Sequence, residues 1–112
     1  MAQDFERYGD QDVGTSAVAI HTSNSDDAII SIRLANTTTS TINASVFITS
    51  SVTGGSQDHY LIKNAPIPVG SSLELIDGGS KIVLQTGDEL KVQSDTDASL
   101  NCYVSFVDAI SE

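Results

Sequence analysis

The stretch that decides the fold runs from Tyr60 to Val92 and reads YLIKNAPIPVGSSLELIDGGSKIVLQTGDELKV. Its short apolar segments are separated by Pro-Val-Gly at 68–70, Gly-Gly at 78–79 and Gly-Asp at 87–88. Glycine adopts positive φ without a Cβ clash, and aspartate accepts hydrogen bonds from nearby backbone N–H groups, so such pairs let one strand reverse into the next. We therefore expect consecutive short strands, with positive φ at Gly87 and at Gly78 or Gly79.

Two prolines punctuate the first part of this stretch, in the segment from Ala65 to Gly70. Proline has no backbone N–H to donate, so it is excluded from the interior of a sheet. The segment around Pro66 and Pro68 is therefore predicted to run along a sheet edge or to cross between two sheets.

Alternating apolar residues extend the β pattern to both sides of the stretch. Alternation is clearest in 28–36 and 42–49, and it continues in 13–22 and 98–110. Short strands with turn signals at intervals of about 8 to 12 residues are typical of sandwiches and jelly rolls. We predict an all-β, antiparallel two-sheet β-sandwich or jelly roll of about eight or nine strands. Its predicted core consists of Ile30, Ile32, Leu34, Val46, Ile48, Leu75, Val83, Leu90, Val104 and Phe106.

The first twelve residues are polar and acidic around Phe5 and Tyr8. Chain ends become ordered mainly when something holds them. We interpret residues 1–12 as an N-terminal arm, which either pairs as an edge strand or reaches a neighbouring subunit. Residues 13–112 are predicted to form a single β-sandwich domain.

Charge and composition exclude several classes of function. The 112 residues contain five basic and fifteen acidic side chains, which gives a net charge of −10. Such a charge repels phosphate backbones and anionic lipid surfaces, so neither nucleic acid nor a membrane is an expected partner. No basic and apolar leader opens the chain, and no apolar run reaches the ~18 residues of a membrane span. We expect synthesis in the cytoplasm without a signal peptide.

Residues that often carry chemistry have structural explanations in this chain. His21 and His59 lack further metal ligands at suitable spacing, and the aspartates collect in turns without forming a calcium-binding loop. No Gly-x-Ser-x-Gly motif is present, and nothing in the sequence places a histidine beside a serine. The single cysteine, Cys102, lies in an apolar register and is expected to be buried. We expect no catalytic residue, no cofactor and no metal site.

Part of the chain resembles a known group of proteins. The order of residues 63–73 (KNAPIPVGSSL), 81–84 (KIVL), Gly87-Asp88 and Lys91-Val92 is similar to that of small virion structural proteins of tailed bacteriophages, notably marine ones. The resemblance covers about half of the chain. It implies a non-enzymatic, repeated subunit of the particle, located on the capsid, neck, tail or fibre.

The sequence therefore favours one function and leaves an alternative open. The favoured function is a virion structural protein, such as a decoration or tail-associated subunit, which contacts other virion proteins and copies of itself. The alternative is a glycan-binding module of a phage fibre, for which Tyr8, Tyr60 and Tyr103 are the available aromatic residues. Apolar or proline residues outside the predicted core form the candidate interface: Phe5, Tyr8, Pro66, Ile67, Pro68 and Val69.

Overall fold

The chain is a two-layer β-sandwich. Its computed structural model describes residues 4–50, 57–76 and 82–108. These ranges contain nine strands: β1 (Asp4–Val13), β2 (Val18–Thr22), β3 (Asp27–Asn36), β4 (Ile42–Ser50), β5 (Gln57–Ile67), β6 (Ser72–Glu74), β7 (Ile82–Leu84), β8 (Glu89–Ser94) and β9 (Leu100–Asp108). Within them, no helix is long and apolar enough to cross a membrane. The predicted all-β sandwich is confirmed.

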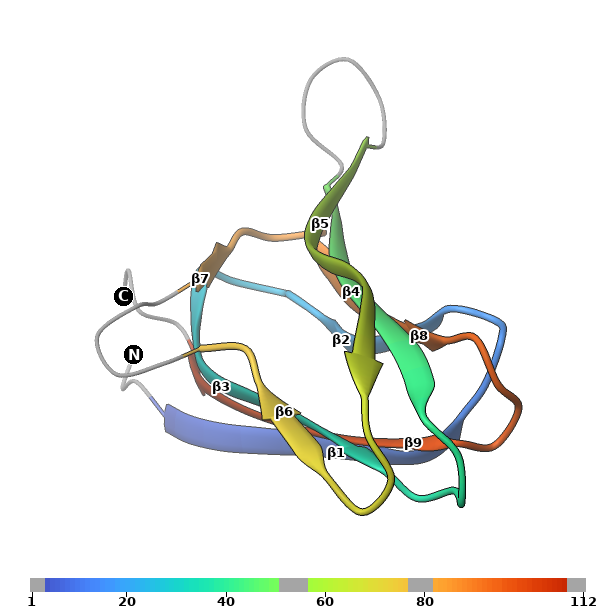
Figure 1. The fold of residues 1–112 in the computed structure, drawn as a ribbon. Helices are drawn as coiled ribbons and strands as arrows, with labels where there is room; N and C mark the ends of the chain where they lie inside the picture. The colour runs from blue at the N-terminus through green and yellow to red at the C-terminus, as the bar shows by residue number, and fades with distance from the viewer. Residues whose placement is uncertain (1–3, 51–56, 77–81, 109–112) are drawn as a thin grey trace.

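All strand pairs are antiparallel and fall into two sheets (Figure 1). The first sheet has the order β1-β9-β3-β6, and β7 also pairs with β3. The second sheet has the order β2-β8-β4-β5. In the first sheet β6 and β7 pair with different parts of β3, so that edge is made of two short strands, whereas β1 forms the opposite edge alone.

The core lies between the sheets and follows the predicted alternation over most of its length. Seven of the ten predicted core residues are buried: Ile32, Leu34, Val46, Ile48, Leu90, Val104 and Phe106. Leu75 is partly buried and packs against the same cluster. Burial of aliphatic and aromatic side chains of this size contributes about 1.5 to 3 kcal/mol each, so this cluster is the main source of stability.

Two predicted core residues lie elsewhere. Ile30 is only partly buried, because the pairing of β3 with β9 shifts between Ile29 and Ser31 and leaves Ile30 as the extra residue of a bulge. Ile29 takes its place in the core. Val83 is 56% exposed, because it points outward from the short edge strand β7. The predicted core positions of Ile30 and Val83 are therefore wrong.

The predicted turn at Gly87 is confirmed. Gly87 has φ 93°, and its N–H donates to Ser23 O at 2.8 Å. Asp88 N donates to Gln85 O, and the Asp88 carboxylate accepts from Gln85 N, so Gly87-Asp88 closes the turn between β7 and β8. Gly78 and Gly79 lie outside the described residues.

The segment around the two prolines is predicted to run along a sheet edge or to cross between two sheets, and it does both. Pro66 lies in β5, which is an edge strand of the second sheet. After Ile67 the chain crosses to β6 in the first sheet through a turn, in which Gly70 has φ 69° and Ser71 N donates to Pro68 O.

Candidate assembly interface

The N-terminal arm forms the long edge strand β1. It pairs with β9 without a register shift from Asp4, opposite Asp108, to Asp10, opposite Cys102. Its other edge has no partner strand among the described residues. An edge of this kind presents a row of unpaired N–H and C=O groups, which is a template for another strand. Of the two predicted arrangements, the structure has the edge strand.

A glycine explains how β1 fits against its neighbour. Gly9 lies opposite Tyr103 of β9, and a Cβ at Gly9 would stand 3.2 Å from Tyr103 Cδ1. That distance is shorter than ordinary carbon contacts, so a side chain at this position would displace the ring. The absence of a side chain lets the Tyr103 ring lie against β1.

The two aromatic residues of β1 are exposed. Phe5 is 81% exposed and Tyr8 is 44% exposed. They lie on opposite faces of β1, because successive residues of a strand alternate and their numbers differ by three. Both therefore remain available for contact with another molecule, and their role in an interface stays a prediction.

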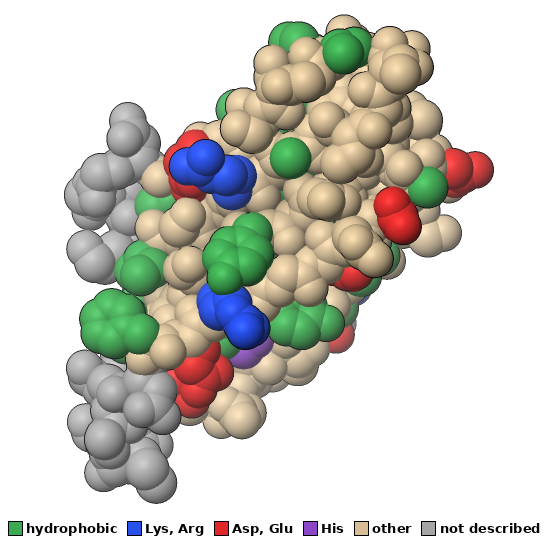
Figure 2. Space-filling model, turned by 90° about the horizontal axis from the view of Figure 1, so that it is seen from below, with side chains coloured by type: hydrophobic (Ala, Val, Ile, Leu, Met, Phe, Trp, Pro, Cys, Tyr) green, Lys and Arg blue, Asp and Glu red, His purple; other side chains and the backbone are tan. Residues whose placement is uncertain are grey.

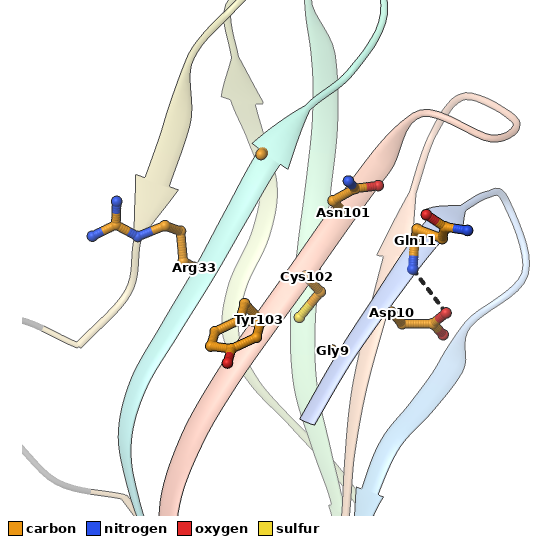
Figure 3. A pocket seen from close by; sticks show the side chains of 8 residues that line it. Gly9, Asp10, Gln11, Arg33, Asn101, Cys102 and Tyr103 are labelled. Carbon is orange, nitrogen blue, oxygen red and sulfur yellow. Dashed lines mark hydrogen bonds between the residues drawn. The ribbon is translucent and has the colours of Figure 1, made fainter. Parts of the chain in front are cut away.

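The outer face of the first sheet carries a shallow hollow beside β1. Its volume is about 480 Å³, and it is lined by Arg33 of β3, Tyr103 and Asn101 of β9, and Gly9 and Gln11 of β1, among others. Figure 3 shows Arg33 on one side of Tyr103, with Asn101 and Gln11 on the other side. Arg33 Nε lies 3.4 Å from Glu74 Oε1, while its side chain is 62% exposed. Sequence reasoning missed this surface, because it depends on which outward residues three strands bring together.

The proline crossing divides into an exposed part and a buried part. Pro66, Pro68 and Val69 are exposed, and Val69 has 52% of its surface accessible. Ile67 is 1% exposed and packs in the core, so its predicted interface role is wrong. The Pro-Ile-Pro pattern is itself an alternation of outward, inward and outward residues, which is the signal that identifies Ile67 as buried.

The second long edge strand, β5, is irregular. Lys63 and Asn64 together face Ser45 of β4, and Asn64 has φ 54°. Asn64 N donates to Ser45 Oγ at 3.0 Å, which holds the bulge in place. Lys63 Nζ lies 4.9 Å from the centre of the Tyr60 ring. Bulges, lysine and proline are the usual features that prevent an edge strand from pairing with another chain.

The histidines and carboxylates form structural contacts. His21 Nε2 lies 2.8 Å from Asp27 Oδ2, and its ring packs on Phe106 at a centroid distance of 4.2 Å. Ser25 Oγ lies 2.9 Å from a carboxylate oxygen of both Asp27 and Asp108, which links the β2–β3 turn to β9. No group of three or more potential metal ligands occurs in 4–50, 57–76 and 82–108.

One serine does lie beside a histidine, contrary to the sequence prediction. Ser50 Oγ is 3.3 Å from His59 Nε2, because the β4–β5 ladder pairs Ile48 with His59. A nucleophilic serine needs a base that is oriented by a third group. Among the described residues no carboxylate contacts His59, so the pair is not a triad.

Cys102 is buried, as predicted. It is 3% exposed, and burial together with the nearby charge of Asp10 raises the pKa of its thiol to about 12. The thiolate is the reactive form of cysteine, so this thiol is protected from disulfide exchange at neutral pH.

The three tyrosines do not form a common platform. Tyr60 lies on the second sheet, where its ring packs on Phe47 at a centroid distance of 4.8 Å. Tyr103 belongs to the first sheet, opposite Gly9. Tyr8 pairs with Val104 and so lies on the other face of that sheet. These three tyrosines therefore do not form a glycan-binding surface of adjacent aromatic rings.

Comparison with known proteins yields a structural match only. No protein-family model matches the chain, and no curated protein matches it. One similar solved structure is a protein of Bacillus endospore appendages, which are described as a family of disulfide-linked pili. It has a TM-score of 0.51 and 18% sequence identity, and the match covers 95% of this chain and 84% of that chain. The two chains share a fold.

This match corrects the predicted function. A bacteriophage virion subunit, with its fibre-module alternative, is wrong: the matching solved structure is a bacterial appendage protein. The residues that carry the resemblance, around Pro66 to Leu73, form the β5–β6 crossing. Edge prolines followed by a glycine turn recur in β-sandwiches for steric reasons, so the fold explains their order here.

Proposed function

We propose that this chain is a non-enzymatic structural subunit that assembles with copies of itself into an open polymer through the edge of β1. The observation that carries the proposal is the outer edge of β1. It has no partner strand among the described residues, its strand pairs with β9 in one register from Asp4 to Asp10, and it lies next to a Phe5 side chain that is 81% exposed. Strand addition at such an edge supplies main-chain hydrogen bonds, and the alternating side chains determine which partner fits.

The charges of β1 favour an open chain over a closed dimer. If a two-fold axis pairs β1 with β1 of another copy, the two strands are antiparallel and paired residues lie on the same face of the joined sheet. The axis then passes through one position of the strand, and the residue at that position lies opposite its own copy. A register centred on Glu6 or on Arg7 pairs that charge with its own copy, and one centred on Tyr8 pairs Glu6 with Asp10. Like charges directly opposite one another destabilise a strand pair. The partner of β1 is therefore a different edge of the next copy, which makes the contact heterologous.

The fold match is compatible with such a role, with one difference. The matching appendage protein belongs to disulfide-linked pili. The present sequence contains one cysteine, and that thiol is buried. Assembly of this chain is therefore proposed to rest on strand pairing and side-chain contacts.

Sedimentation velocity and negative-stain microscopy of the purified chain test the proposal. We expect assemblies larger than a dimer, which increase as salt screens the repulsion between subunits of charge −10. Phe5→Lys adds an edge lysine next to the unpaired backbone and is expected to weaken assembly by about tenfold.

Val69→Lys is the matched control for this variant. It also replaces an exposed apolar residue with lysine, but on the proline crossing. Equal loss of assembly in both variants would show that assembly does not depend specifically on β1. A wild-type chain that stays monomeric at every salt concentration would overturn the proposed function.

A further inference from the structure

The basic side chains of this acidic protein are unequally available. Of the four that the structure describes, Lys91 Nζ lies 3.6 Å from Glu89, and Lys63 lies over the Tyr60 ring. Arg33 uses Nε to contact Glu74 and keeps 62% of its side chain exposed, while Arg7 is exposed and makes no salt bridge to any described residue. Among the described basic side chains, Arg7 and the part of the Arg33 guanidinium that Glu74 leaves unused are thus available to a partner.

Both arginines lie on the outer face of the first sheet. Arg7 lies opposite Ser105, and Arg33 lies opposite Tyr103, which is two residues away from Ser105 on the same face of β9. Figure 2 shows this face, on which basic side chains lie on either side of an apolar one and acidic side chains lie beside and around them. We call this surface, which carries Arg7, Arg33 and Tyr103, the arginine face.

The hollow on the arginine face fits an extended segment that bears a carboxylate. The guanidinium of Arg33 offers donors to a carboxylate, and Asn101 and Gln11 on the far side of Tyr103 offer amide groups that suit a peptide backbone. Asp10 also lines the hollow, and its Oδ1 accepts from Gln11 N at 2.8 Å. Because Asp10 repels an anion, the carboxylate of the bound segment belongs at the Arg33 side.

The chain itself has an exposed acidic end of matching chemistry. Asp97 is exposed in the β8–β9 turn, and one of its oxygens accepts a long hydrogen bond of 3.3 Å from Thr15. Asp12 is exposed at the end of β1, and its backbone N–H donates to Asn101, which places it at the same end of the sandwich. Neighbouring Asp95 is instead engaged with its own chain, since it accepts from both Asn43 N and Asn43 Nδ2.

We infer that the arginine face of one copy binds the acidic end of a second copy, with Arg7 and Arg33 meeting Asp97 and Asp12. The inference rests on the proposed self-assembly and identifies a second contact in it. Subunits of charge −10 repel one another unless carboxylates of one meet cations of the next. When this face-to-end contact is not repeated by a two-fold axis it is heterologous, and it then extends an open polymer in the same way as the proposed β1 contact.

A charge-reversal series tests the inference by sedimentation of the purified chain. The face variant carries Arg7→Glu and Arg33→Glu, and the end variant carries Asp12→Arg and Asp97→Arg. Each is expected to weaken assembly by about tenfold or more, and their combination in one chain is expected to restore it, because the complementary charges exchange places. Failure of the combined variant to recover would overturn the acidic end as the partner.

Two further variants separate this contact from net charge and from folding. Lys63→Glu changes the net charge by the same amount as one arginine reversal but lies on β5, and we expect assembly close to wild type. Arg7→Gln removes only an exposed charge, so it retains the fold if the face variant loses it. Unchanged assembly in Arg7→Gln and in the folded face variant would overturn the inference while leaving assembly through β1 standing. A monomeric wild type would instead remove the proposed function.

Discussion

The two long edge strands of the sandwich, β1 and β5, differ in whether their exposed backbone can pair with another chain. β5 has two register irregularities, the proline at Pro66 and a lysine near its middle. β1 pairs regularly from Asp4 to Asp10, has one register shift near its end, between Asp10 and Val13, and contains neither proline nor lysine. An exposed edge that is long and regular is normally selected against, because it pairs with other chains. β5 therefore carries features that prevent pairing with another chain, whereas β1 offers the edge on which the proposed assembly depends.

The two strands also differ in how firmly the core holds them. β5 inserts Ile67 into the core at 1% exposure, and Ile62 packs partly against it. β1 contributes Val13 at its far end, while Phe5 and Tyr8 remain exposed. β5 is thus held by side-chain burial, and β1 is held mainly by its backbone pairing with β9.

The largest expected effect tests this difference in anchoring. Ile67→Ala removes a fully buried side chain and is expected to lower the free energy of unfolding by about 2 to 5 kcal/mol. Phe5→Ala on β1 is expected to change it by less than about 0.5 kcal/mol, because Phe5 is 81% exposed. Urea unfolding at low protein concentration, where the chain is monomeric, measures both. Similar losses in the two variants would show that β1 is packed as firmly as β5.

A pH-dependent effect of intermediate size concerns the end of the sandwich where β1 begins. Burial raises the pKa of Asp27, but hydrogen bonds with His21, Asp108 and two serines outweigh it and lower the pKa from 3.8 to about 2. The carboxylate is therefore more stable in the folded chain, and its contribution is present above pH 3.8 and is lost as the pH falls toward 2. Its size is on the order of 2 kcal/mol.

Urea unfolding between pH 2 and 7 measures this contribution. Asp108 pairs with Asp4 at the start of β1 and is joined to Asp27 through Ser25, so acid is expected to loosen this end before it affects β5. Asp27→Asn is expected to be less stable at pH 7 and to lose most of the decline in stability below pH 4. If the free energy of unfolding of Asp27→Asn falls below pH 4 as steeply as that of the wild type, other carboxylates cause the decline.

Most of the fold follows from patterns that the sequence displays locally. Alternation identified Ile32 and Val104 as core residues, and the Gly-Asp pair identified the turn at Gly87, because each depends on residues close together in the chain. Ile30 was misplaced because a bulge shifts the alternation by one residue, and bulges are set by the partner strand. The same limit applies to Val83, whose exposure depends on its place in a short edge strand.

The candidate interface was only partly predictable for a related reason. Phe5 and Tyr8 were identified because they stand apart from any core pattern within a single segment. The arginine face depends on the register of β1, β9 and β3, which places Arg7 and Arg33 on one surface although they are far apart in sequence. The function was misassigned because edge prolines and glycine turns report the mechanics of a β-sandwich and carry no information about its partners.

The smallest expected effect probes the bulge that distinguishes β5 from β1. Asn64 has φ 54°, a conformation that asparagine tolerates and that costs a β-branched residue about 1 to 2 kcal/mol. Asn64→Val is therefore expected to lower the free energy of unfolding by this amount, whereas Asn64→Gly, which accepts the same φ, is expected to stay within about 0.5 kcal/mol of wild type. If valine instead straightens the bulge, β5 gains a regular edge like that of β1, and the variant is expected to self-associate more strongly in the sedimentation assay. An Asn64→Val chain that is as stable as wild type and no more associated would show that the bulge is not what protects β5, and the contrast between the two edges would then rest on Lys63 and Pro66.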